Sequence, residues 1–108
     1  MSRNQFSQVN VTATTVATAQ LIIGSSDEYQ PSIVVNQDGV AAVVQLIASE
    51  TQPVGTEKSF ATLSVNATDP QTVAWAEGEL PVFPANMNVY AYLSTGASAV
   101  VLAGARAH

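Results

Sequence analysis

The stretch Pro31-Ser-Ile-Val-Val-Asn-Gln-Asp-Gly-Val-Ala-Ala-Val-Val-Gln-Leu-Ile-Ala48 decides the fold. Two runs rich in β-branched residues, 33–35 and 40–47, flank the polar turn Asn36-Gln37-Asp38-Gly39. Glycine reaches a positive φ at little cost, and Asn and Asp side chains hydrogen-bond readily to a turn backbone. The stretch therefore predicts a β-hairpin at the centre of a single hydrophobic core.

The second arm of this hairpin is apolar on both faces. Val40, Ala42, Val44 and Leu46 share one face, and the opposite face carries Ala41, Val43 and Ile47. A strand of this kind is covered on both sides. The cover is either the second layer of a sandwich or a subunit contact, and the second possibility makes Ala41, Val43 and Ile47 candidate interface residues.

Alternation with a period of two continues along the chain. It extends over the 15 residues from Val9 to Ile23, which exceeds a usual strand of about five or six residues. We therefore expect two strands or one bent strand here, with a break near Thr14 to Ala17. Further strands are expected at 59–65, 72–76, 87–93 and 99–103, whereas Pro81 and Pro84 lack the ladder donor and exclude a central strand.

The fold class predicted from this pattern is all-β, an antiparallel β-sandwich or jelly roll of about seven to eight strands, with turn signals every 8 to 12 residues. Residues 9–103 form the single domain, residues 1–8 a flexible N-terminal arm and residues 104–108 a frayed C-terminal tail. The segments 24–31 and 49–58 read as loops because they hold glycine, proline and clustered polar residues.

Charge is scarce, since only 10% of the 108 residues are charged and the net charge is -5. Three basic residues form no patch for a phosphate backbone, which argues against nucleic-acid binding. No apolar run approaches the length of about 20 residues that crosses a bilayer, and the N-terminus lacks the apolar core of a signal peptide. We therefore expect neither nucleic acid nor membrane as a partner.

The polar surface comes instead from 34 Ser, Thr, Asn and Gln residues. A free small protein usually relies on charge for solubility. A neutral polar surface favours a protein that packs against copies of itself or against another protein, while an acidic soluble monomer remains the alternative.

No residue pattern predicts an enzyme. The chain has no cysteine, and its only histidine is the final residue, His108, which argues against a histidine-based triad or zinc site. Glu77 and Glu79 would share one side of an extended segment, but a chain with short loops rarely builds a glycosidase cleft around such a pair. The carboxylate spacing matches no calcium motif, so we expect no catalytic residue, metal or cofactor.

The aromatic residues support two interpretations. Tyr90 and Tyr92 lie on one strand face, where they either cover the sheet as a pair or contribute to a subunit interface or sugar platform. Trp75 suits a core or edge position. The full set of candidate interface residues is Trp75, Phe83, Tyr90, Tyr92, Ala41, Val43 and Ile47.

Three segments together resemble the small β-sandwich proteins of tailed-bacteriophage virions. They are the Thr-rich strand 11–14 leading to 19–23, the strand Ser32-Ile33-Val34-Val35-Asn36, and the final hairpin Val89-Tyr90-Ala91-Tyr92-Leu93 that continues to Leu102. The resemblance spans about half of the chain. It departs from the group at Gln30-Pro31, where a basic residue is common, and at Pro84-Ala85-Asn86, where a Pro-Gly turn is common.

The resemblance implies a capsid decoration, or cement, protein. Such a subunit assembles as a homotrimer, binds the major capsid protein and stabilises the shell. Its location would be the capsid surface of the virion, after synthesis in the host cytoplasm. The alternative is a phage fibre or tail domain, or a host-glycan-binding module that uses Tyr90, Tyr92 or Trp75.

Overall fold

The computed structural model describes residues 5–37, 41–65, 72–75 and 81–107, with only the backbone described at 36–37 and 72–75. These residues form eight strands and one turn of 3₁₀ helix: β1 (Gln5–Val11), η1 (Val16–Thr18), β2 (Gln20–Ile23), β3 (Tyr29–Gln37), β4 (Ala42–Ser49), β5 (Ala61–Val65), β6 (Thr72–Trp75), β7 (Asn88–Thr95) and β8 (Ala99–Ala107).

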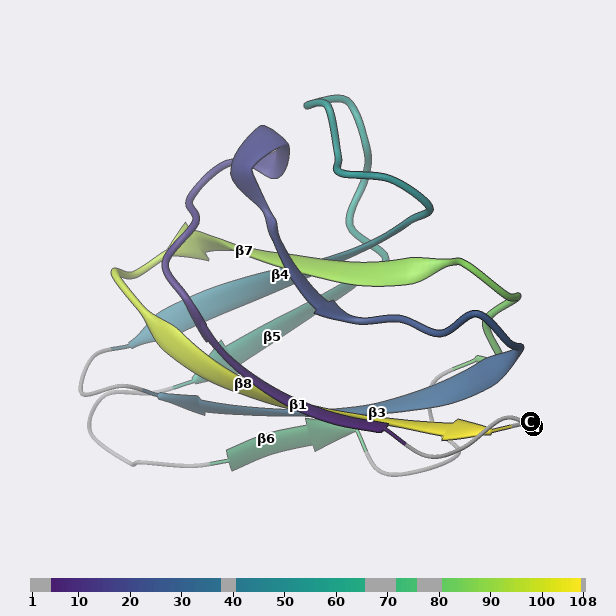
Figure 1. Ribbon diagram of the computed structural model, residues 1–108. Coiled ribbons are helices and arrows are strands. Elements are labelled where there is room, and N and C mark those ends of the chain that lie inside the picture. The colour runs from purple at the N-terminus through teal and green to yellow at the C-terminus, as the bar shows by residue number, and fades with distance from the viewer. Residues whose placement is uncertain (1–4, 38–40, 66–71, 76–80, 108) are drawn as a thin grey trace.

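The strands form two four-stranded sheets packed face to face (Figure 1). Sheet A has the order β1-β8-β3-β6 and sheet B the order β2-β7-β4-β5. Every pairing is antiparallel. Because the chain passes back and forth between the two layers in this order, the architecture is a jelly roll, which confirms the predicted all-β class.

The hairpin predicted at 31–48 is wrong, because its two arms lie in different sheets. β3 pairs with β8 and β6 in sheet A, and β4 pairs with β7 and β5 in sheet B. The turn residues 38–40 lie outside the described part of the chain. A turn signal specifies a reversal of direction, and a crossover between layers reverses the chain as well as a hairpin does. The long ladders to β7 and β8 decide between them.

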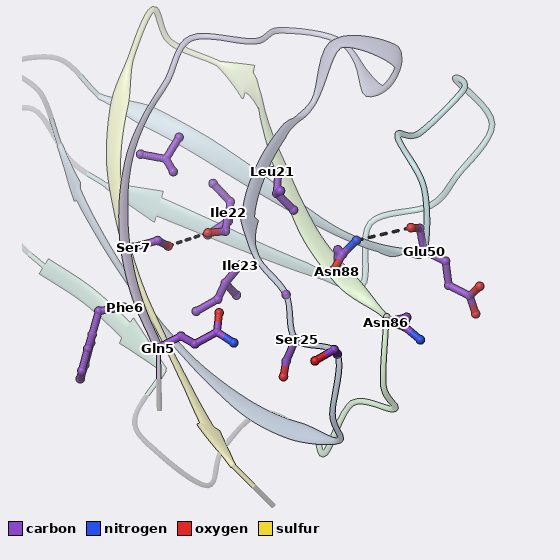
Figure 2. A pocket seen from close by; sticks show the side chains of 13 residues that line it. Gln5, Phe6, Ser7, Leu21, Ile22, Ile23, Ser25, Glu50, Asn86 and Asn88 are labelled. Atoms are coloured by element: carbon purple, nitrogen blue, oxygen red, sulfur yellow. Dashed lines mark hydrogen bonds between the residues drawn. The ribbon is translucent and has the colours of Figure 1, made fainter. Parts of the chain in front are cut away.

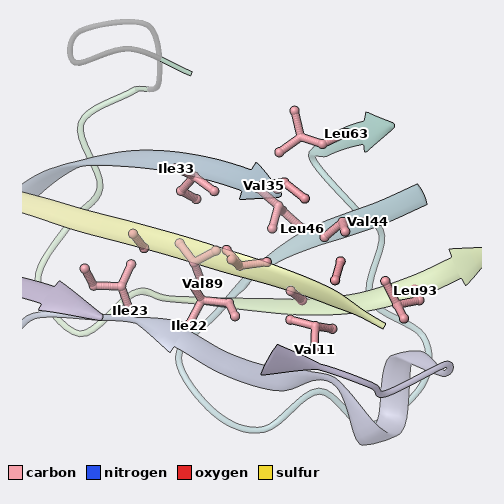
Figure 3. Close-up of a cluster of buried hydrophobic side chains, with 14 of the residues drawn as sticks. Val11, Ile22, Ile23, Ile33, Val35, Val44, Leu46, Leu63, Val89 and Leu93 are labelled. Atoms are coloured by element: carbon pink, nitrogen blue, oxygen red, sulfur yellow. The ribbon is translucent and has the colours of Figure 1, made fainter. Parts of the chain in front are cut away.

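The predicted central position of these two arms is confirmed. Each is an inner strand of its sheet, and Ile33 and Val35 of β3 are fully buried, as are Val44 and Leu46 of β4. With alternate residues of β7 and β8 they fill the space between the layers (Figure 3). Among the described residues the core holds no buried polar or charged side chain, so hydrophobic packing holds the layers together.

Both ends expected to be loose contain strand residues that pair with each other. β1 begins at Gln5 and β8 extends to Ala107. Their ladder is continuous from the pair Gln5↔Ala105 to the pair Val11↔Ala99. The expected break within 9–23 is present, since η1 at Val16–Thr18 separates β1 from β2.

Pro31 lies inside β3 rather than in the predicted loop 24–31. The Tyr29 N–H donates to the Phe83 carbonyl and the Phe83 N–H to the Tyr29 carbonyl, so odd residues of β3 direct their backbone groups away from β8. The missing proline donor therefore lies on the side away from β8, so the ladder between β3 and β8 loses no bond.

Candidate binding surfaces

The chain itself covers part of the outer face of sheet B, around Ile47 and Tyr90. The segment 12–19, which contains η1, packs over Ile47 and Tyr90 and forms a small second cluster with them through Ala19. The Leu93 N–H donates to the Ala13 carbonyl at 2.7 Å, which fixes this segment on the sheet. The apolar second face predicted for β4 thus receives its cover at Ile47, which is 0% exposed, from the same protomer.

The segment 12–19 is also tied to the β4–β5 loop, and the two rise together on the sheet B side of the molecule (Figure 1). Gln52 Nε2 donates to the Ala19 carbonyl at 2.7 Å. Within the loop, the Glu57 carboxylate accepts hydrogen bonds from the backbone N–H groups of Val54, Gly55 and Thr56. These bonds hold the pKa of Glu57 below its ordinary value.

The structure brings only some of the predicted interface residues together. Tyr92 is half-buried beside the cluster of Ile47 and Tyr90. Phe83 belongs to the main core, where its ring makes edge contacts with Tyr29 at 5.7 Å and Phe60 at 5.6 Å between centroids. Because Ile47, Tyr90 and Phe83 are all buried within the protomer, they present almost no surface to a partner.

The remaining predicted residues lie elsewhere. Ala41 is exposed just before β4 and Val43 is half-buried within it. Trp75 is the last residue of β6, and its side chain lies outside the described part of the structure.

No described segment packs on the outer face of sheet A in this way. Its rows follow the strand register: Phe6, Gly104 and Ser32 form one row, and Gln8, Leu102 and Val34 the next. A shallow hollow of about 520 Å³ on this face is lined only by residues of β1, β3 and β8. We call the surface formed by Phe6, Ser32, Val34, Val100, Leu102 and Gly104 the sheet A face.

Phe6 is the most exposed large apolar side chain of the described residues, with 88% of its surface accessible. Its ring lies beside Gly104, where an added Cβ atom would stand 3.6 Å from Phe6 Cε1 and 3.0 Å from Ser32 Oγ. An aromatic residue that covers a glycine on the neighbouring strand supplies the packing that the glycine lacks. The Phe6 ring thus lies next to the bare backbone of Gly104.

The sheet A face carries no carboxylate among the described residues. Asp27 and Glu28 lie in the β2–β3 loop, and Glu50 and Glu57 in the β4–β5 loop. The only described charge on the outer side of sheet A is Arg106, near the end of β8. In a chain of net charge -5, this surface is neutral and apolar.

A groove of about 640 Å³ separates the edge strands β1 and β2 (Figure 2). The Ser7 hydroxyl bridges it by donating to the Ile22 carbonyl at 2.5 Å. At one end, Gln20 Oε1 accepts the N–H groups of Thr12 and Ala13, and Gln20 Nε2 donates to the Asn10 carbonyl. The groove lining includes the amide side chains of Gln5, Asn86 and Asn88, together with Glu50 and apolar residues of β1 and β2.

The described residues contain no group of three or more His, Cys, Asp and Glu side chains that could hold a metal ion. In the described part of the chain, no helix has the length and apolarity needed to cross a bilayer. The sequence interpretation missed the sheet A face because Phe6 fell in the expected arm, although Val34, Val100 and Leu102 already alternate with core positions.

Among the described residues, the sheet A face and the β1–β2 groove are thus the two candidate binding surfaces. Comparison with known proteins finds no family model and no curated protein that matches the chain.

Proposed function

We propose that this protein is a structural component of a tailed-bacteriophage virion, a capsid decoration subunit that binds the major capsid protein and acts at the capsid surface. The observation that carries the proposal is the neutral, apolar sheet A face, which the described part of the chain leaves uncovered. An uncovered apolar sheet face marks an interaction site. The jelly-roll architecture, which is common in viral capsid domains, and the sequence resemblance support the same function.

Binding would use the centre of the sheet A face. Val34, Val100 and Leu102 are half-buried in the protomer, and a partner would complete their burial at about 25 cal/mol per Å² of apolar surface. The molecule measures 42 × 28 × 18 Å, so a broad face can supply the roughly 800 Å² per partner of a stable interface. A subunit that binds only the assembled lattice stabilises the shell by mass action.

Replacement of Leu102 by lysine tests this surface. The variant places an ammonium group at the centre of the sheet A face, and we expect co-sedimentation with undecorated capsids of the encoding phage to weaken by roughly tenfold or more, about 1.4 kcal/mol. Leu21→Lys is the matched control, because Leu21 is 53% exposed on β2 in sheet B and the chemical change is identical. Wild-type binding by Leu102→Lys, with an unchanged melting temperature, would contradict the proposal.

Glycan recognition is the second candidate, and one observation favours it. The β1–β2 groove presents the amides of Gln5, Asn86 and Asn88 beside apolar residues of β2, a mixture suited to hydroxyl-rich ligands. Tyr90 offers no sugar platform because it is 6% exposed. Glycan-array binding that Asn88→Ala abolishes, with no capsid binding by the wild type, would select this function instead.

A further inference from the structure

We propose that the free edge of β1 pairs with β1 of a second copy of this chain, so that sheet A runs continuously across a two-fold dimer. This inference concerns self-association and does not depend on the capsid proposal. It is carried by the backbone groups that β1 presents, by its lack of edge protection and by its neutrality.

The open edge of β1 presents the backbone groups of its even-numbered residues. The Asn10 carbonyl and the Thr12 N–H are both bonded by the Gln20 side chain, on the side away from β8. Backbone groups of alternate residues in a strand point to the same side. The N–H and C=O groups of Phe6 and Gln8 therefore face the open edge, and no described residue hydrogen-bonds to them.

β1 is the longest of the described edge strands and has no edge protection. Among the described strands, β1 has seven residues, whereas the other edge strands β2, β5 and β6 have four, five and four. Natural edge strands are protected by charge, proline, bulges or short length. β1 reads Gln-Phe-Ser-Gln-Val-Asn-Val and pairs with β8 without a register shift, so it has none of these protections. β2, in contrast, is short and interrupted by a shift between Leu21 and Ile23.

A second copy of this chain is the partner that suits the uncharged β1 strand. Copies of a chain with net charge -5 repel one another, and a strand without any charge is a place where they can approach. Antiparallel pairing about Gln8 sets Gln8 opposite its own copy, Phe6 opposite Asn10 and Ser7 opposite Val9. All of these pairs are neutral, and the two Gln8 amides can hydrogen-bond across the axis. A strongly basic or acidic partner would find no matching charge on β1.

This register satisfies the exposed backbone groups. The two Gln8 residues exchange two ladder bonds, and each Phe6 exchanges bonds with an Asn10 of the other copy, which gives about six in total. The Asn10 carbonyl accepts one bond from Gln20 and keeps a second lone pair for this purpose. The groove beside β1 leaves space next to this edge (Figure 2). Pairing also places the sheet A faces of the two copies side by side.

Sedimentation analysis of the full chain tests the dimer. At about 100 μM, a concentration suited to an interface below about 1,200 Å², we expect a mass twice that of the 11.2 kDa protomer. Gln8→Lys sets two ammonium groups face to face and should raise the dimer dissociation constant by roughly tenfold or more, an effect that high salt reduces. Ser64→Lys is the matched control, because Ser64 is exposed on the edge strand β5 and the charge change is the same; it should remain dimeric.

Gln8→Pro probes the backbone itself. It removes one N–H from the free edge while the ladder to β8 uses the odd residues, so the variant should be monomeric at every salt concentration with the melting temperature of the Gln8→Lys monomer. A wild-type monomer at this concentration, a trimer, or a Gln8→Pro dimer of wild-type affinity would overturn the proposal. Because capsids are absent from this experiment, its failure is separate from failure of the decoration function.

Discussion

At the scale of single residues, Tyr29 connects the two layers of the sandwich. Its ring is 1% exposed in the main core, and its hydroxyl donates to the Met87 carbonyl just before β7. Burial raises the pKa of the Tyr29 hydroxyl to about 12, because the phenolate form loses its hydration there.

A turn residue shows a different constraint: Gly96 has φ 96°, and an added Cβ atom would lie 2.6 Å from the Ala41 carbonyl oxygen.

Replacement of Tyr29 by phenylalanine should lower the free energy of unfolding by about 1–2 kcal/mol, because the part-buried Met87 carbonyl loses its donor. The pH dependence has a definite sign. A raised pKa in the folded state means that the Tyr29 contribution is complete below about pH 10 and disappears as the pH rises toward 12. Denaturant titrations between about pH 8 and 11 should therefore show a smaller difference between wild type and Tyr29→Phe at the higher pH.

Tyr92→Phe is the control for this experiment, since Tyr92 is half-buried and its hydroxyl makes no hydrogen bond with the described residues. A Tyr29→Phe variant as stable as wild type at neutral pH would show that the bond to Met87 contributes nothing.

At the scale of elements, the strand periodicity in the sequence predicts the positions of most strands but not which strands pair with each other. β5, β6 and β7 lie close to their predicted ranges. Turn chemistry is local and predicts a hairpin at 31–48, while the choice between pairing and crossing layers depends on β7 and β8, which lie far along the chain. For the same reason, local sequence signals could not predict that the two chain ends pair with each other in the β1–β8 ladder.

One side chain makes three hydrogen bonds to the segment between β1 and β2. Gln20 bonds Asn10, Thr12 and Ala13 at 3.1, 2.7 and 2.9 Å, and it thereby ties the end of β1 to the start of β2. Gln20→Ala should cost about 1–3 kcal/mol of unfolding free energy, because backbone groups lose their partners. It should also speed amide exchange at Thr12 and Ala13. Unchanged exchange at these two amides would contradict this role.

At the scale of the whole molecule, the two outer faces differ in how far the described chain covers them. The segment 12–19 covers the outer side of Ile47 and Tyr90 on sheet B, whereas no described segment covers the neutral sheet A face. The sequence could predict that both faces of β4 are covered, but it could not tell whether the cover came from the same chain. Two of the predicted interface residues, Ile47 and Tyr90, lie where the chain covers itself.

The measurement that tests the central claim most directly is hydroxyl-radical footprinting of the protein free and bound to undecorated capsids. Phe6 and Val54 are 88% and 75% exposed in the protomer, and they lie on β1 and in the β4–β5 loop. If the sheet A face binds the coat lattice, labelling of Phe6 and Leu102 falls several-fold below its level in the free protein, and labelling of Val54 stays the same. Protection of Val54 with unchanged labelling of Phe6 and Leu102 would contradict the account.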